Sequence, residues 1–467
     1  MTCMCSEEDC GFSGYRQAVK EATNLIVTPD EEISSQELMH VMMSGVRVLN
    51  VDLAKSDKNI EFMGKLKNSI NLFESESKFN LQITKLCMSR ERIPRTGRMR
   101  NDCHYKLRQG DEIILTSDKH YENCSTNEVC YLSNFKRFLP LIEPEDKIRI
   151  GLKIVLKVTK VALGSLVNCC VMENDFIKSY QEVKISSIVD ENLELTQEEI
   201  EDFDIAKYVG FDFIIVPGVN FPERYHKLKK LTRGSDLKMI ADIDPRIEKA
   251  EIDRIIEHFN GVFVQASAND EYILNKAREL KKLTIANFPM ENSFGHQAMK
   301  VCENADLLML ECSSNVREAA NNLINIMKNM KKLKEIRGSF NTKNVCIDSV
   351  LNVSSVVKAI VCLTQNEITA KRIASSHPQC TVIFLTKCKT LVKRLQMWRN
   401  VHAIVYDDNG EKSWNEQRKK MMKIAVMYGE NMNIFKSEDA IVTCCPIESE
   451  FHDIDSFKIS RISEFYE

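Results

Sequence analysis

The sequence lacks any apolar run long enough to cross a membrane. No stretch reaches the roughly 18 apolar residues that a transmembrane helix needs, so no membrane span is expected. The formal net charge of -3 leaves no basic surplus for binding nucleic acid. The segment Met1–Cys10 is acidic and has no apolar core, so it does not resemble a secretory signal. These absences argue against a membrane, nucleic-acid-binding or secreted protein and predict a cytoplasmic one.

Clustered metal ligands are also scarce, although the chain has 17 cysteines. The count is odd and most cysteines lie singly in apolar runs, which predicts buried free thiols rather than disulfides. The alternative interpretation of the N-terminal segment is a metal site formed by Cys3, Cys5 and Cys10. No second Cys/His cluster at zinc-finger spacing accompanies them.

Strand-like and helical segments alternate through most of the chain. Its 467 residues, 43% hydrophobic and 28% charged, indicate a globular protein, and this length suggests roughly two to four domains. Ser34–Met39 leads one helical segment, a capping-box sequence at Thr196 opens another, and 246–259 has apolar residues at helical spacing. Eight strand-like runs, mostly followed by helices, predict a (β/α)8 TIM barrel. These runs are Asn24–Thr28, Arg47–Val51, Gln82–Cys87, Phe213–Pro217, Lys238–Ile243, Gly261–Gln265, Leu283–Ala286 and Asp306–Leu310.

Two parts of the chain break this alternation. About 125 residues separate the third and fourth runs, far more than a βα loop needs, and their strand-like runs predict an inserted small β-barrel domain. Beyond residue 338, alternating strands and helices predict a C-terminal open α/β domain, with expected strands Ala359–Leu363, Thr381–Leu385, Ala403–Tyr406 and Ala440–Thr443. The expected α/β fold therefore has an N-terminal tail at 1–22, a barrel at 23–97 and 191–338, the inserted domain at 98–190 and the C-terminal domain at 339–467.

The segment Lys238–Asp244 joins a short apolar strand to two acids. Residues two apart on a strand point to the same face. Asp242 and Asp244 are therefore expected to project together from the carboxyl end of the strand. That end is where α/β enzymes place their catalytic groups.

Four local motifs on this architecture resemble those of the pyruvate kinase family. Ile93–Gly97 is similar to the family's E-I-R-T-G, and Met43–Asn50 resembles its S-G-M-N-V-A-R-M-N-F-S-H-G segment. Asn260–Val264 resembles D-G-I-M-V-A-R-G-D-L-G, and Asn304–Leu310 resembles G-A-D-C-I-M-L-S-G-E-T. The motifs occur in the family's order. The resemblance covers most of the chain and implies a barrel that transfers phosphoryl from phosphoenolpyruvate to ADP with Mg²⁺ and K⁺.

The resemblance also implies that several active-site groups are replaced. The family's catalytic lysine falls on Asp242, and its metal-binding glutamate falls on Asp244, a shorter carboxylate that still suits a hard cation. The substrate-binding arginine falls on Asn50, and the threonine of A-T-Q-M-L-E-S falls on Phe288. The arginine that faces nucleotide phosphates is retained as Arg95, which could instead pair with a local acid.

The implied cation sites are altered as well. The potassium-site asparagine and serine fall on Asp52 and Ala54, and the third-strand aspartate and threonine fall on Met88 and Ser89. The second metal carboxylate falls on Ala268. Mg²⁺ and K⁺ are thus implied by the resemblance, while this chain replaces most of their ligands.

Other roles remain open for the two acids of the fifth strand. Asp244 precedes Pro245, a typical first helical residue, so it could be a helix-start carboxylate. Asp242 and Asp244 could also form a new cation site with Asp52 or Glu311, or be solvated acids at the barrel mouth.

Three functions remain open from the resemblance. The first is a pyruvate-kinase-like protein with lost or strongly impaired catalysis. The second is an active kinase in which Lys55 or Arg90 supplies the missing cations. The third is a non-catalytic partner that assembles with an active relative, because the family forms tetramers. The segment Thr364–Thr369 replaces the family's T-K-S-G-R-S effector loop, so effector binding is not expected.

Overall fold

The computed structural model divides the chain into two compact units. One unit is Glu91–Glu194, and the other joins Met1–Arg90 to Leu195–Glu467. The structure describes residues 24–53, 60–90, 94–133, 135–151, 153–162, 166–179, 181, 183–185, 195–245, 247–265, 270–288, 301, 304–311, 345–407, 413–448 and 452–465. Within these ranges, no helix combines the length and the hydropathy that a bilayer span requires.

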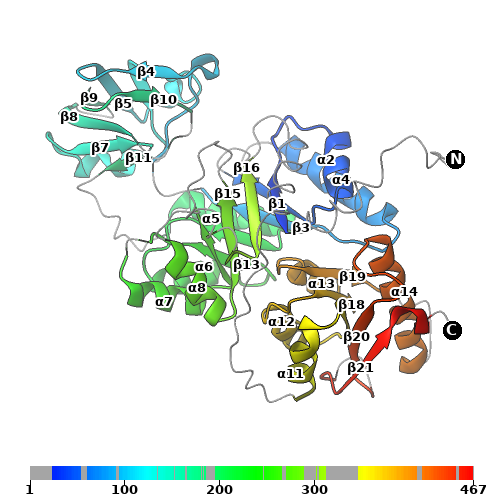
Figure 1. Ribbon diagram of the computed structural model, residues 1–467. Coiled ribbons are helices and arrows are strands. Elements are labelled where there is room, and N and C mark those ends of the chain that lie inside the picture. The colour runs from blue at the N-terminus through cyan, green and yellow to red at the C-terminus, as the bar shows by residue number, and fades with distance from the viewer. Residues whose placement is uncertain are drawn as a thin grey trace. The chain divides into compact units, whose positions relative to one another are not determined.

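A closed barrel of eight parallel strands forms the first part of the larger unit (Figure 1). Each strand pairs with the next along the chain, the long insertion aside, and the last strand pairs with the first. All eight predicted strands are confirmed, with small shifts at their ends. They are β1 (Leu25–Thr28), β2 (Val48–Asp52), β3 (Thr84–Met88), β12 (Phe213–Val216), β13 (Lys238–Asp242), β14 (Gly261–Val264), β15 (Leu283–Phe288) and β16 (Leu307–Glu311).

Helices follow most of these strands and cover the outside of the barrel (Figure 1). The predicted capping box is present, with Thr196 paired to Glu199, and the structure adds a second one, with Ser34 paired to Glu37. Each box satisfies backbone N–H groups that the first helical turn leaves without partners. The helices are α2 (Ser35–Met43), α4 (Ile60–Glu76), α5 (Gln197–Val209), α6 (Glu223–Leu231), α7 (Lys249–His258) and α8 (Glu271–Glu279).

Helix α7 begins later than the sequence predicts. Pro245 lies in a turn in which the backbone N–H of Ile247 donates to the carbonyl of Asp244 at 3.3 Å. The helix starts at Lys249, with Glu248 as its N-cap residue. The interpretation of Asp244 as a helix-start carboxylate is therefore wrong, because the chain leaves β13 through a turn that favours proline at its second position.

The two faces of the barrel strands belong to different parts of the core. Val27 and Ala241 pack in one cluster with the surrounding helices, so they face outward. Ile26, Leu86 and Ile240 share a second cluster with other alternate strand residues, so they face the barrel interior. Side chains two apart on a strand share a face, so this alternation also assigns the polar residues at the strand ends.

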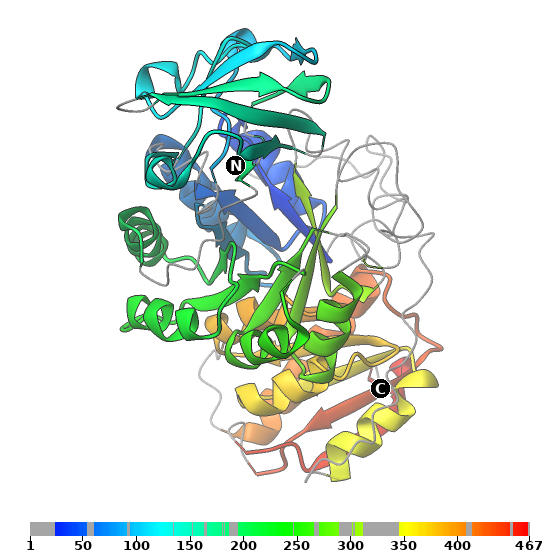
Figure 2. The ribbon, with the colours of Figure 1, turned by 90° about the vertical axis from the view of Figure 1, so that its left-hand side faces the viewer.

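The smaller unit is a β-rich domain with its own core (Figure 2). Six strands pair in the order β11-β7-β8-β9-β5-β6, and β10 pairs with β4 in a second sheet. The strands are β4 (Tyr105–Leu107), β5 (Glu112–Thr116), β6 (Val129–Tyr131), β7 (Lys147–Ile150), β8 (Ile154–Ala162), β9 (Leu166–Val171), β10 (Asp175–Ile177) and β11 (Val183–Ile185). Short 3₁₀ turns lie at Arg100–Asp102, Lys119–Tyr121, Phe135–Arg137 and Leu139–Leu141.

The C-terminal domain is an open five-stranded sheet in the order β19-β18-β17-β20-β21. The strands are β17 (Ala359–Leu363), β18 (Thr381–Thr386), β19 (Val401–Val405), β20 (Ala440–Cys445) and β21 (Ser456–Arg461). The helices α11 (Val345–Asn352), α12 (Glu367–Ala374) and α13 (Lys389–Leu395) pack on one face, and α14 (Trp414–Asn431) packs on the other. Strand β19 begins two residues earlier than predicted, and the antiparallel edge strand β21 was not predicted.

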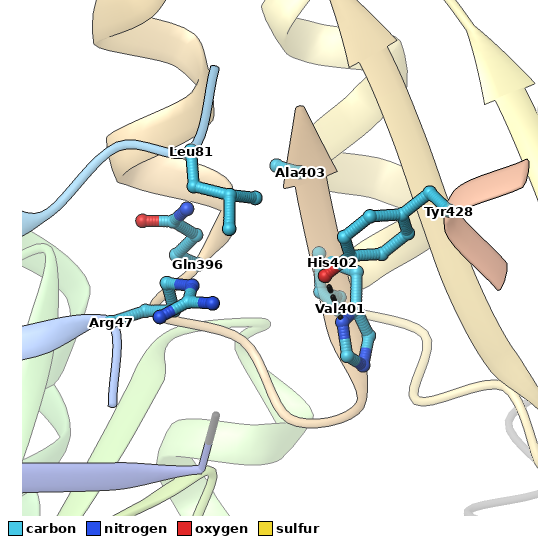
Figure 3. A pocket seen from close by; sticks show the side chains of 7 residues that line it. All are labelled: Arg47, Leu81, Gln396, Val401, His402, Ala403 and Tyr428. Atoms are coloured by element: carbon cyan, nitrogen blue, oxygen red, sulfur yellow. Dashed lines mark hydrogen bonds between the residues drawn. The ribbon is translucent and has the colours of Figure 1, made fainter. Parts of the chain in front are cut away.

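Polar contacts join the C-terminal domain to the amino-terminal ends of the barrel strands, here called the barrel base. The Thr84 hydroxyl donates to the Lys393 carbonyl at 2.8 Å, and the Asn80 amide donates to Asp407 at 2.8 Å. A small hollow lies beside these contacts and has no room for a water-sized sphere. Its lining consists of Arg47, Leu81, Gln396, Val401, His402, Ala403 and Tyr428 (Figure 3). It is therefore a packing gap rather than a ligand site.

The described cysteines are all free, as predicted, and half of them are buried. Burial raises the pKa of the Cys130 thiol to about 12, which leaves it a packing residue rather than a nucleophile. The candidate metal cysteines Cys3, Cys5 and Cys10 lie outside the described residues.

Candidate functional site at the barrel mouth

The carboxyl ends of the barrel strands, here called the barrel mouth, carry acids and amides on the inward face. Ile240 faces inward on β13, so Asp242 at the end of that strand does as well. The same alternation from Val48 places Asn50 and Asp52 on the inward face of β2. Asp242 and Asp52 are both half-buried. The expectation that a carboxylate of the fifth strand faces the mouth therefore agrees with the strand register.

Asn50 is the most buried of these polar residues, with 2% of its surface exposed. Its side-chain amide donates to the Thr28 hydroxyl at 3.0 Å and contacts the Met309 sulfur at 3.8 Å. Thr28 lies on β1, which pairs with β2, and Met309 lies on β16, the next strand beyond β1. The amide oxygen of Asn50 has no hydrogen-bond partner among the described residues. A buried amide stands here where the resemblance places an arginine.

A pair of side-chain amides lies on adjacent strands of the mouth. The side-chain amide of Asn287 on β15 donates to the Gln265 oxygen, just beyond β14, at 3.0 Å. Ile285 faces inward two residues before Asn287, so the pair belongs to the same rim. Thr28, Gln265 and Asn287 were not singled out from the sequence. Period-two alternation within each strand was the signal that could have found them.

Asp244 lies past the end of β13 and is half-buried. Its backbone carbonyl closes the turn that contains Pro245. Within the described ranges, no three His, Cys, Asp or Glu side chains come together as a metal centre. A new cation site built from Asp242, Asp244 and a third described acid therefore receives no support from the structure.

Arg90, a candidate substitute cation for the mouth, instead binds helix α5. Its Nε donates to Oδ1 of Asp202 at 2.8 Å, and its backbone N–H donates to Oδ2 of the same residue at 2.7 Å. Its Nη2 also lies 3.1 Å from Glu201. Asp202 is fully buried, so this ion pair fixes the exit of β3 against α5.

Arg95 belongs to the smaller unit, within the motif that resembles E-I-R-T-G. Its backbone exchanges hydrogen bonds with Ser133, with the Arg95 N–H donating to the serine hydroxyl at 2.9 Å and the Ser133 N–H donating to the Arg95 carbonyl at 2.8 Å. Nearby Gly97 has a steric reason to be glycine, because an added Cβ would lie 2.6 Å from the Glu122 carbonyl. This segment of the smaller unit is thus tightly packed, and the phosphate role of Arg95 stays a prediction.

Several sequence candidates lie where the structure gives no description. Ala54, Lys55 and Ala268 fall outside the described residues. For Phe288 and Glu311 only the backbone is described, on β15 and β16 respectively.

The described residues fit poorly to the implied cations. The potassium positions include Met88, a soft thioether that is not a ligand for a hard cation, and Ser89, whose hydroxyl donates to the Ile215 carbonyl at 3.3 Å. For Mg²⁺, Asp244 is the one described carboxylate at the family's two positions. Hence no reaction step is assigned to either ion.

The described inward-facing side chains at the strand ends, Thr28, Asn50, Asp52, Met88, Asp242 and Asn287, include no Lys, Arg or His. Basic residues lie instead at the opposite ends of the strands, where Arg47 precedes β2, Lys85 lies in β3 and Lys238 begins β13. A site for a transferred phosphoryl group needs cations and hydrogen-bond donors. The described part of this mouth presents mainly acceptor oxygens.

The fold defines a TIM-barrel protein with a β-rich insertion after the third strand and a C-terminal α/β domain. A family model described as "Pyruvate kinase, alpha/beta domain" matches residues 349–459. Pyruvate kinase 2 of Saccharomyces cerevisiae is 19% identical, covering 79% of this chain and 81% of the yeast protein. Pyruvate kinase 1 of Trypanosoma brucei brucei is 19% identical over 93% of this chain and 95% of its own length. The family-model match and these relatives, which extend over most of the chain, support membership of the pyruvate kinase family.

Proposed function

We propose that this chain is a pyruvate-kinase-like protein that has lost most or all of the phosphoryl transfer between phosphoenolpyruvate and ADP. The observation that carries the proposal is Asp242, an inward-facing acid at the position to which the resemblance assigns the catalytic lysine. The replacement removes a cation and adds an anion where a phosphate group would bind.

The change in charge sets the size of the expected loss in the rate of phosphoryl transfer. Two like charges at contact distance repel by about 1 kcal/mol in water and by about 4 kcal/mol at an effective dielectric constant of 20. Loss of one electrostatic donor to a developing charge typically lowers the rate by about 10²–10³-fold. Asn50 removes a second cation in the same mouth. The combined changes favour a binding role over a catalytic one.

The test is a coupled assay of the purified chain with phosphoenolpyruvate, ADP, Mg²⁺ and K⁺, beside pyruvate kinase 2 of Saccharomyces cerevisiae. We expect a rate lower than the yeast enzyme's by at least about 10²-fold. Calorimetry should show that Asp242→Lys strengthens phosphoenolpyruvate binding. The control Glu257→Lys makes the same charge change on the exposed surface of α7 and should have no effect. Turnover of the unmodified chain at the yeast rate would refute the proposal.

The alternative of an active kinase requires other cations at the mouth. Arg90 is engaged by Asp202 and Glu201, which weakens its candidacy. Lys55 is then the residue to test. Any measured activity that Lys55→Ala leaves unchanged would exclude this version.

Assembly with family members is the second candidate function, and the C-terminal domain offers an observation in its favour. Strand β21 is the edge of its sheet, and it exposes Phe457 and Ile459 by 41% and 50%. An edge strand with exposed apolar side chains favours pairing with another chain. We propose a homo- or hetero-tetramer in the cytoplasm, as the family resemblance implies.

Chromatography with light scattering can test this assembly, alone and mixed with an active relative. We expect the unmodified chain to elute as an oligomer and Phe457→Lys/Ile459→Lys to elute as a smaller species. The control Leu72→Lys places a charge on the exposed face of α4 and should leave the oligomer intact. A monomer under both conditions would exclude an assembly role.

A further inference from the structure

Two histidines from neighbouring helices meet on the outside of the barrel. His226 lies on α6 and is exposed, and His258 is the last residue of α7 and is half-buried. Their ring centres are 5.5 Å apart, and the ring planes are inclined by 81°. The two helices follow the paired strands β12 and β13, so the rings lie in the helical layer and not in the barrel interior (Figure 1). Two neutral imidazoles at this distance are candidate ligands for one transition-metal ion.

The ring of His258 is fixed in one tautomer. Its Nδ1 lies 2.7 Å from the backbone carbonyl of Arg254, one turn earlier on α7. A carbonyl oxygen only accepts hydrogen bonds, so Nδ1 must carry the proton and donate it. The neutral ring therefore keeps its lone pair on Nε2, which is the atom that can bind a metal ion. Metal-binding histidines usually have this arrangement, in which the other ring nitrogen donates to a carbonyl, a carboxylate or water.

Tyr225 holds the same ring from another side. The Tyr225 ring centre is 5.3 Å from that of His258 and 5.3 Å from that of the buried Phe259. These contacts limit the rotation of His258. The exposed ring of His226 can instead turn about its side-chain bonds to aim a nitrogen at its neighbour. The pair thus combines one fixed ligand with one adjustable ligand.

The separation of the two rings suits one shared ion. A metal ion bound to imidazole lies about 2.0–2.1 Å from the ligating nitrogen, and hence about 3.2 Å from the ring centre. Two rings on one tetrahedral ion therefore have centres about 5.2 Å apart. The observed 5.5 Å is close to this value. Two planes inclined by 81° intersect in a line, so one ion on that line can lie in both ring planes, as the in-plane lone pairs require.

The charged groups around the pair do not oppose a cation. The guanidinium of Arg254 lies 3.0 Å from Glu223 and 3.0 Å from Glu251, so acids of both helices balance it. On α6, Glu223 lies one turn before His226 and Lys230 lies one turn after it. Within the described ranges, no three His, Cys, Asp or Glu side chains come together as a metal centre. Water therefore has to complete the coordination of an ion held by the two rings.

We propose that His226 and His258 form a two-histidine site for a divalent transition ion of the class that imidazole prefers, such as Ni²⁺, Cu²⁺ or Zn²⁺. Nε2 of His258 and one ring nitrogen of His226 bind the ion, and water molecules take the remaining positions. The bound ion ties α6 to α7 and so stabilises the helical layer outside β12 and β13. The site uses no residue of the barrel mouth and is independent of the function proposed there.

Chemical modification of the unmodified chain gives the most local test. Diethyl pyrocarbonate acylates imidazole nitrogens that carry a free lone pair, and peptide mass spectrometry locates each acylated histidine. The probe ion is Ni²⁺, because imidazole suits it better than the thiols of the chain do. We expect Ni²⁺ to protect His226 and His258 together and to leave His40, an exposed histidine of α2, reactive. Protection of neither ring or of one alone, or equal protection of His40, overturns the proposal.

Calorimetric titration with Ni²⁺ gives the second measurement. His226→Asn and His258→Asn should each weaken binding by at least about tenfold, and the control His40→Asn should leave it unchanged. Urea unfolding then tests the link between the helices. Ni²⁺ at about one hundred times its Kd should lower the unfolding equilibrium constant of the unmodified chain about 100-fold, and that of the two variants much less. Rings that serve only for packing would give the same Ni²⁺ affinity and the same unfolding in all four chains, and this result would overturn the proposal.

Discussion

Replacing Arg224 should destabilise the larger unit more than any exposed charge change of the same kind. Arg224 lies at the start of α6, and its Nη2 pairs with Oε1 of Glu199 on α5. The two side chains are 2% and 3% exposed. Nη1 of Arg224 also donates to the carbonyls of Gly218 at 2.8 Å and Pro217 at 3.3 Å, at the mouth end of β12. One side chain thus holds two helices and a strand exit together.

The magnitude follows from what Arg224→Met leaves behind. The apolar volume is roughly kept, but the buried Glu199 carboxylate loses its ion pair with Arg224, and the carbonyls of Pro217 and Gly218 lose a donor. Removing one partner of a buried ion pair typically costs about 3–5 kcal/mol. With a urea slope of about 3 kcal/mol/M, the unfolding midpoint should fall by about 1 M or more.

The assay is urea denaturation followed by circular dichroism, with two comparison variants. Arg254→Met removes a cation from an ion pair with Glu223 in which both side chains are more than half exposed, and it should not shift the midpoint measurably. Arg224→Met/Glu199→Gln removes both charges, and glutamine can retain the capping hydrogen bond from the Thr196 N–H, which is 2.9 Å long in the wild type. This double variant should recover most of the loss. Equal midpoints for Arg224→Met and Arg254→Met would refute the reasoning.

Two further predictions concern other parts of the chain. Gly97→Ala should destabilise the smaller unit by roughly 1–3 kcal/mol in thermal unfolding, because the added Cβ would meet the Glu122 carbonyl at 2.6 Å. The control is Gly64→Ala on α4, where an added Cβ would have no atom within 4 Å, and this variant should be neutral or stabilising. Burial, with Lys371 nearby, lowers the pKa of Lys282 from 10.5 to about 8 against the opposing effect of Glu257. The folded amine therefore releases its proton before the unfolded one, and the wild type should gain stability relative to Lys282→Met as the pH rises from about 8 to 10.5. Lys281→Met is the control, and parallel urea midpoints for the wild type and Lys282→Met between these pH values would contradict the assignment.

The barrel strands were predictable because the buried residues of each strand form a short run of consecutive apolar residues. Runs such as Phe213–Val216 are buried along their whole length, as strands covered on both faces require. The helix start at Thr196 was equally predictable, because a capping box is a local hydrogen-bond pattern within four residues. Strand β21 was not, because its burial pattern is mostly exposed and an edge strand needs no apolar run.

The candidate mouth was predictable only in part. Period-two alternation placed Asp242 at the strand end, and the inward direction followed once Ile240 was known to face the barrel interior. The partner of Arg90 was not readable, because Asp202 lies 112 residues away on a helix that follows the insertion. A local motif therefore marked Arg90 as a mouth residue, while tertiary packing bound it to α5.

The sequence by itself determined where the strands, the insertion and the C-terminal domain lie, because hydrophobic periodicity and capping act over a few neighbouring residues. Only the tertiary structure decided which charges meet. Arg224 contacts Glu199, and His377 contacts Asp306, because the fold brings segments that are distant in the sequence together around a core. The free energy of a buried charge depends on its neighbours in space, and those neighbours are set by the fold as a whole.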